Sequence, residues 1–150
     1  MKLDLDRYVP GLLLWLSNKL AGSASSLYRA RFDLGVTEWR MLSYFQVHPW
    51  STASQACDLM GIDKAAVSRS IATLRENGWL KARPDGLRKV EYALTGEGRK
   101  LHDQIARLAV AREDALLTGF SDKERQQLLG YLHRLLDNLE IVRQVGREDE

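Results

Sequence analysis

The sequence predicts a mainly α-helical chain that carries one small β-hairpin. Several segments place apolar residues three and four positions apart, and capping residues such as Asp63 and Ser121 precede two of these segments. Residues 79–94 differ, because they contain a Pro-Asp-Gly turn, and apolar and polar residues alternate after it over residues 89–94. A length of 150 residues suits a single domain with a full hydrophobic core.

The composition is typical of a globular protein. Hydrophobic residues make up 45% of the chain and charged residues 28%. No apolar run approaches the ~18 residues that span a bilayer, and the N-terminus lacks a secretion pattern, so we expect a cytoplasmic protein. The single cysteine, Cys57, excludes a disulfide within the chain and agrees with that compartment.

Two helices are predicted in the N-terminal third. Pro10 suits the first turn of a helix that reaches about Arg31. Thr37 is expected to cap a second helix, which ends before Pro49 because the residue preceding a proline is biased away from helix. Their apolar residues at helical spacing are Leu12, Leu13, Leu16, Leu20 and Leu27 in the first, and Trp39, Leu42 and Phe45 in the second.

The centre of the chain has the pattern of two short helices joined by a turn. Thr52 and Gln55 form a predicted capping box that starts the first of them. Gly61 suits its C-terminal turn, and Asp63 is a strong N-cap for a second helix over residues 64–77. Ala56, Leu59 and Met60 are expected on the apolar side of the first helix. The buried residues farther along are expected to be Ile62 before the second helix, and Val67, Ile71 and Leu74 within it.

The opposite face of helix 64–77 is unusual for a solvated surface. At about 100° per residue, it carries small and hydrogen-bonding side chains around a single arginine, Arg69. Bulky side chains would keep a helix out of a DNA major groove about 12 Å wide, whereas arginine reads guanine edges. An ordinary surface helix rich in small residues is the alternative. The residues of this face are Ala65, Ser68, Arg69, Ala72 and Thr73.

Positive charge is concentrated in the same part of the chain. Residues 64–89 contain seven basic and two acidic side chains, a balance of +5, whereas the whole chain has a net charge of +2. The remaining chain is therefore net acidic, and this segment is the one suited to meet phosphates. In the hairpin, Val90, Tyr92 and Leu94 are expected to face the core, and Lys89, Glu91 and Ala93 the solvent.

Two further helices are predicted after the hairpin. Thr95 should cap a long helix that ends at Gly119, and a capping box at residues 121–124 should start the last helix. Apolar residues of the last helix alternate four- and three-residue steps, as in coiled coils, so we expect the terminal helices to form a dimer. Packing within one subunit is the alternative. The apolar positions are Leu101, Ile105, Leu108 and Ala115, then Leu128, Leu132, Leu135, Leu139 and Val142; residues 148–150 are an acidic tail.

Four short stretches are distinctive in their order and spacing. They read LGVTEWRML at 34–42, AVSR at 66–69, NGWL at 77–80 and LTGEG at 94–98. Together they resemble the MarR family of bacterial transcription regulators over nearly the whole chain. The resemblance implies a winged helix-turn-helix homodimer on a palindromic operator, usually a repressor relieved by a ligand or oxidant. It implies one MarR-like domain over 1–150, with dimerisation helices at 1–33 and 96–145 and a winged-helix DNA-binding lobe at 37–95.

Double-stranded DNA is the predicted partner. Arg88 keeps the family's spacing to Thr95, while the acidic residue of the usual Asp-x-Arg wing motif is displaced by one, to Asp85. The resemblance therefore favours Arg88 as a minor-groove or phosphate contact. Rival interpretations are a winged-helix protein-interaction module and sequence-neutral DNA binding. The expected DNA-binding residues are Ala65, Ser68, Arg69 and Thr73 at bases, Lys64 and Arg75 near phosphates, and Arg83, Arg88 and Lys89 on the wing.

The remaining chemistry of the sequence indicates neither an enzyme nor a metal or cofactor site. His48, His102 and His133 lie on different predicted helices, without metal-ligand spacing. Related peroxide sensors carry a reactive thiol on the first helix, which this chain lacks. Cys57 is instead expected to pack as a small apolar residue against helix 64–77.

A small aromatic acid is the effector that the resemblance implies. Relatives often bind such acids between the dimerisation helices and the DNA-binding lobe, where an aromatic wall beside a cation could hold a carboxylate. Equally, Trp15 and Trp39 could be core residues and Arg40 a salt-bridge partner. The candidate residues are Trp15, Lys19, Trp39, Arg40, Tyr44 and His48.

Overall fold

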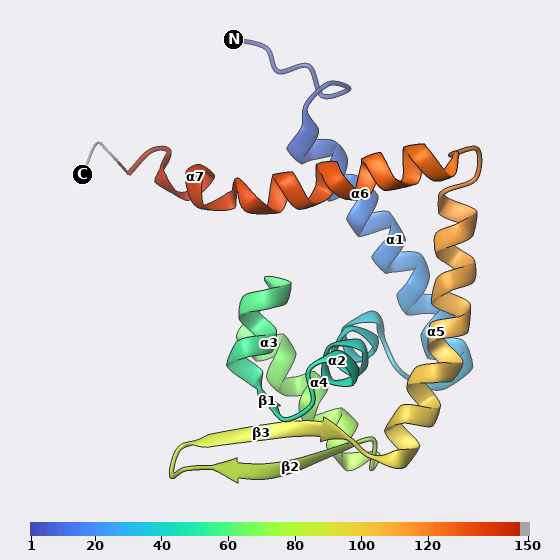
Figure 1. The fold of residues 1–150 in the computed structure, drawn as a ribbon, viewed down its shortest axis with the longest axis vertical. Helices are drawn as coiled ribbons and strands as arrows, with labels where there is room; N and C mark the ends of the chain where they lie inside the picture. The colour runs from blue at the N-terminus through green and yellow to red at the C-terminus, as the bar shows by residue number, and fades with distance from the viewer. Residues whose placement is uncertain (148–150) are drawn as a thin grey trace. The chain divides into compact units, whose positions relative to one another are not determined.

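The computed structural model describes residues 1–147 and divides the chain into two compact units, Met1–Arg107 and Leu108–Glu150. The predicted acidic tail at 148–150 lies outside the described residues. The mainly helical fold with a small hairpin is confirmed (Figure 1). The elements are α1 (Val9–Phe32), α2 (Val36–Val47), β1 (Ser51–Thr52), α3 (Ala53–Met60), α4 (Lys64–Glu76), β2 (Leu80–Asp85), β3 (Lys89–Leu94), α5 (Gly96–Leu116), α6 (Asp122–Asp137) and α7 (Leu139–Gln144).

Helices α2, α3 and α4 and a three-stranded antiparallel sheet form the central lobe of the first unit. The strand order is β1-β3-β2, with Ser51 opposite Tyr92 and Leu80 opposite Leu94. Strand β1 was not predicted, because its two residues immediately precede α3 and have no alternating pattern of their own. The largest fully buried side chains of the first unit are Leu34, Met41, Leu42, Phe45, Val67, Leu74 and Ile105.

Local capping chemistry fixes where α3 and α4 begin. The Thr52 hydroxyl accepts from the Gln55 amide at 3.2 Å, and the Gln55 side chain accepts from the Thr52 amide at 2.9 Å. An Asp63 carboxylate oxygen accepts from the Ala66 amide at 3.0 Å. These bonds satisfy amides that have no partner within the helix, so the predicted starts of both helices are confirmed.

Three local predictions around these helices were wrong. Helix α2 is capped at Gly35 rather than Thr37, because the Glu38 side chain reaches back to accept from the Gly35 amide. Ile62 is only half-buried, since it lies in the turn and not under a helix. Leu59, expected on the apolar side of α3, is 66% exposed.

The hairpin departs from the predicted alternation of buried and exposed residues. Val90 is 41% exposed although it was expected to face the core, whereas Ala93 was expected outside and is buried. Both faces are covered where β3 approaches α5, so Ala93 and Leu94 are buried together. Farther out the hairpin extends beyond α3 and α4 (Figure 1), and Val90 on this part of β3 is partly exposed.

The second unit contains the end of α5 and the helices α6 and α7. The capping box of α6 is present: the Ser121 hydroxyl accepts from the Glu124 amide at 3.2 Å. The predicted last helix is interrupted at Asn138, which separates α6 from α7. On the coiled-coil-like face, Leu132, Leu135, Leu139 and Val142 are exposed and Leu128 is half-buried. Within residues 1–147, no helix is both long enough and apolar enough to cross a membrane.

Candidate nucleic-acid interface

The outer face of α4 is exposed as the helical period predicted. Ala65, Ser68, Arg69 and Ala72 lie in solvent, and Thr73 is half-buried. The opposite face buries Val67, Ile71 and Leu74 against the lobe, and this burial holds the helix in place.

The polar side chains of this face differ in how free they are. The side chains of Ser68 and Arg69 form no hydrogen bond or ion pair with any other described residue, so both remain available to a ligand. The Thr73 hydroxyl already donates to the Arg69 carbonyl at 3.1 Å, which leaves it chiefly an acceptor. Lys64 and Arg75 are exposed near opposite ends of the helix.

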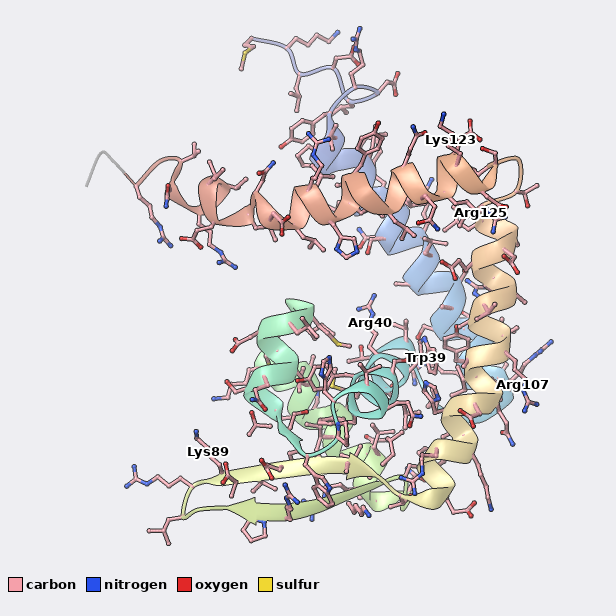
Figure 2. All side chains as sticks on the ribbon, viewed as in Figure 1. Trp39, Arg40, Lys89, Arg107, Lys123 and Arg125 are labelled. Atoms are coloured by element: carbon pink, nitrogen blue, oxygen red, sulfur yellow. The ribbon has the colours of Figure 1, made fainter. Side chains whose placement is uncertain are left out.

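The hairpin wing ends in a three-residue turn, residues 86–88. Gly86 has φ +68°, a conformation that glycine adopts without strain. Arg88 and Lys89 are exposed beside it, and Figure 2 shows Lys89 projecting away from β3. Leu87 at the tip is fully exposed, which the sequence pattern did not predict. The tip therefore presents two cations and one apolar side chain to a partner.

Arg83, the third predicted cation of the wing, is held by neighbours. Its Nε donates to a Glu91 carboxylate oxygen at 2.7 Å across the β2–β3 pair. Its guanidinium also lies 4.2 Å from the ring centroid of Trp50, and the Lys81 ammonium lies 5.3 Å from the same ring. Arg83 is thus less available to DNA than Arg88.

Trp50 is the residue of this surface that sequence reasoning missed. It has φ +60°, which is uncommon for a residue other than glycine, and its amide donates to the Tyr92 carbonyl at 2.8 Å. That bond continues the β1–β3 ladder and places the indole under the basic side chains of β2. The only sequence signal was an aromatic residue between Pro49 and the capping box.

Breaking the Arg83–Glu91 ion pair should strengthen DNA binding. In Glu91→Gln, Arg83 loses its charged partner and becomes available to contact a DNA phosphate. Such a contact releases a counterion from the DNA. We expect affinity to rise about threefold to tenfold at low salt, with the slope of log K against log salt steeper by about one. Fluorescence anisotropy with a labelled duplex over a salt series measures both quantities.

Glu97→Gln is the matched control for this experiment. Glu97 also pairs with one cation, Lys100, at 2.9 Å, and both side chains are exposed on α5. The control removes the same negative charge without freeing a cation of the wing. Equal gains in both variants would mean that net charge alone is responsible, and no gain in Glu91→Gln would contradict the prediction.

The predicted ligand residues do not surround a single cavity. Trp39 and Arg40 line a largely apolar pocket of about 400 Å³ between α1 and α2, together with Leu13, Leu16, Leu20 and Tyr28. Trp15 and Lys19 are exposed on α1 and do not line it. Figure 2 labels Trp39 and Arg40 on α2.

The other two predicted ligand residues lie at the C-terminal end of α2, Tyr44 in its last turn and His48 as its C-cap. Tyr44 is buried in the lobe, with its ring centroid 5.1 Å from that of Phe45 and 4.9 Å from that of His48. The Trp39 ring stacks on the His102 ring, with 5.3 Å between the ring centroids. Cys57 is half-buried on α3. Among residues 1–147, no group of three or more His, Cys, Asp or Glu side chains is placed to hold a metal ion.

The fold and the exposed basic surface define the first unit as a winged helix-turn-helix, in which α3 and α4 form the helix-turn-helix and β2–β3 the wing. Comparison with known proteins agrees. A MarR family model matches residues 32–89. The crystal structure of a MarR/EmrR family transcriptional regulator from Acinetobacter sp. ADP1 is similar, with 30% identity, a TM-score of 0.84, and coverage of 92% of this chain and 99% of that chain.

This chain belongs to the MarR family of transcriptional regulators, which are DNA-binding proteins and not enzymes. The HTH-type transcriptional regulator YybA of Bacillus subtilis (strain 168) is 24% identical over 126 residues, which cover 81% of this chain and 84% of YybA. The structure of an S. aureus MepR–DNA complex shares the fold, with 19% identity, a TM-score of 0.76, and coverage of 91% of this chain and 99% of that chain.

Proposed function

We propose that the protein is a cytoplasmic repressor that binds a palindromic operator as a homodimer. The observation that supports base reading is the free Arg69 on the outer face of α4, flanked by Ser68 and other small residues. On this proposal Ala65, Ser68, Arg69 and Thr73 face bases, and Lys64 and Arg75 lie at phosphates. Arg88 and Lys89 of the wing supply the adjoining contacts, with a lesser part for Arg83.

Exposed apolar side chains support the homodimer. Leu12, Leu14 and Leu16 of α1 are 42%, 58% and 48% exposed. In the second unit, Leu136 of α6 and Ile141 of α7 are 62% and 63% exposed. Such faces need a cover in solution, and a second copy of the same helices supplies one. A two-fold dimer would also set two recognition helices about one DNA turn apart.

The dimer is tested by sedimentation equilibrium. We expect the mass of two chains, about twice 17.1 kDa, at micromolar concentration. Leu136→Glu places a charge on the exposed face of α6 and should shift the equilibrium toward the monomer, whereas Lys123→Glu near the start of that helix should not. A monomeric parent protein would contradict the proposal.

A small aromatic acid is the proposed effector, and the pocket between α1 and α2 is its proposed site. Trp39 and Tyr28 offer aromatic surface, and Arg40 forms no ion pair with any other described residue, so it could hold a carboxylate. Trp15, Lys19, Tyr44 and His48 are not part of this narrower proposal, because they do not line the pocket.

Selection of bound duplexes from a random-sequence pool tests the function as a whole. Recovery of an inverted repeat, with each half protected from cleavage, is the expected result. Benzoic and phenolic acids added to the binding reaction should release the selected duplex. Equal affinity for a scrambled duplex would mean sequence-neutral binding, and no affinity for any duplex would support a protein-interaction module.

A further inference from the structure

The Glu38 carboxylate connects α2 to α4. One of its oxygens accepts from the Gly35 amide at 2.8 Å and so caps α2. The other accepts from the Ser70 hydroxyl of α4 at 2.9 Å, 32 residues farther along the chain. Ser70 is only 2% exposed, and Glu38 is half-buried. A single side chain therefore joins the start of one helix to the middle of another.

This bond differs in kind from the other attachments of α4. In the part of the chain that the structure describes, it is the only side-chain hydrogen bond from α4 to another helix. Val67, Ile71 and Leu74 attach the buried face by apolar contacts, and the Leu74 carbonyl accepts from the Trp79 amide at 2.9 Å. Apolar burial is non-directional and resists separation more than it resists rotation or sliding. A hydrogen bond depends on angle and distance, so it specifies how α4 is turned.

A carboxylate is well suited to this position. It presents two oxygens to two donors at once, and hydrogen bonds to a charged acceptor are about twice as strong as neutral ones. The space around Gly35 is also tight. A Cβ there would lie 2.8 Å from both the Glu38 carboxylate and the Arg29 guanidinium, so glycine leaves room for Glu38 to reach its amide.

Arg69 lies next to Ser70 on α4 and faces outward. Glu38, Ser70 and Arg69 all border one small pocket of about 150 Å³, into which Arg29 of α1 also reaches. A rotation of α4 about its axis would move Ser70 off Glu38 and swing Arg69 relative to the lobe. The direction in which Arg69 points is thus linked to the bond between Ser70 and Glu38.

We propose that Glu38 is a positioning residue for sequence recognition, which through Ser70 holds α4 at the rotation that aims Arg69 at a base. The inference rests on the proposed function, in which α4 reads bases. Glu38 touches no DNA on this account. Its effect is on the choice between sequences, because phosphate contacts tolerate a turned helix and a bidentate base contact does not.

Ser70→Ala tests the inference, since it removes the bond to α4 and leaves the cap of α2. Alanine fits the buried position and favours helix. We expect roughly tenfold weaker binding to the selected operator, unchanged binding to a scrambled duplex, and an unchanged salt slope. Ser43→Ala is the control: Ser43 is half-buried, and its hydroxyl donates to the Trp39 carbonyl of its own helix at 3.0 Å.

A double-mutant cycle ties the effect to Glu38. In a Glu38→Ala background the Ser70 substitution should cost nothing further in operator binding, because its partner is already gone. Two results would overturn the inference. One is Ser70→Ala binding the operator as tightly as the parent while Arg69→Ala is impaired, which leaves the proposed function intact. The other is an equal loss of affinity of Ser70→Ala for the operator and for the scrambled duplex, together with a lower melting temperature of the variant. If Arg69→Ala also binds normally, base reading by Arg69 fails, and with it the part of the proposed function on which the inference rests.

Discussion

Arg69→Ala should weaken binding to the selected operator by about 1–3 kcal/mol and relax the preference for one base pair in each half-site. Arg69 is the one basic residue in the middle of the exposed face of α4, and its side chain has no hydrogen-bonding or charged partner among the described residues. Its removal therefore takes nothing from the fold. Anisotropy titrations against the operator and its single-base variants measure both effects.

Arg88→Ala is the control of equal charge for that experiment. Arg88 lies in the wing turn, where a phosphate or minor-groove contact is proposed. Its loss should weaken binding across all sequences alike and reduce the salt slope by about one. Unchanged operator binding by Arg69→Ala would show that α4 does not read bases through this side chain.

Gly98→Ala should destabilise the protein by about 3 kcal/mol, which lowers the melting temperature by roughly 6–12 °C for a chain of this size. A Cβ at Gly98 would overlap the Trp79 carbonyl oxygen and lie 2.9 Å from the carbonyl carbon. The collision is with backbone, which cannot rotate away as a long side chain can. The Thr95 amide and hydroxyl donate to the Trp79 and Gly78 carbonyls at 3.1 and 2.7 Å, so the start of α5 is also held in place.

Gly96→Ala is the matched control two residues earlier in α5. Apart from its chain neighbours and the backbone of its own helix, no atom lies within 4 Å of a Cβ at Gly96, so that variant should melt within a few degrees of the parent. Circular dichroism melting of both variants gives the comparison. A Gly98→Ala protein as stable as Gly96→Ala would mean that α5 can shift away from Trp79 at little cost.

Features set by neighbouring residues could be predicted from the sequence. The capping residues Thr52, Asp63 and Ser121 act within three positions, so the pattern alone placed the starts of their helices. The exposed face of α4 followed in the same way from the helical period. The position of the predicted base-reading residues was thus available early, while their role stays a prediction.

Features set by distant parts of the chain could not be predicted in this way. The burial of Ala93 depends on which elements cover the hairpin. The cation–π contact of Arg83 depends on Trp50, which is far away in sequence. The bond between Glu38 and Ser70 is of the same kind. Each side chain looks ordinary in its own segment, and only the packing of the lobe gives it a partner.

Strand β1 has a mechanical consequence. Its two residues run directly into α3 and pair with β3, while Trp50 adds a bond to the Tyr92 carbonyl. Backbone hydrogen bonds therefore connect the wing to the strand that leads into α3, the first helix of the helix-turn-helix. A tilt of the wing requires α3 to move with it. We expect the hydrogen-exchange rates of the Trp50 and Tyr92 amides to rise and fall together. If the proposed effector moves the lobe, the hairpin should therefore move together with α3 and not independently of it.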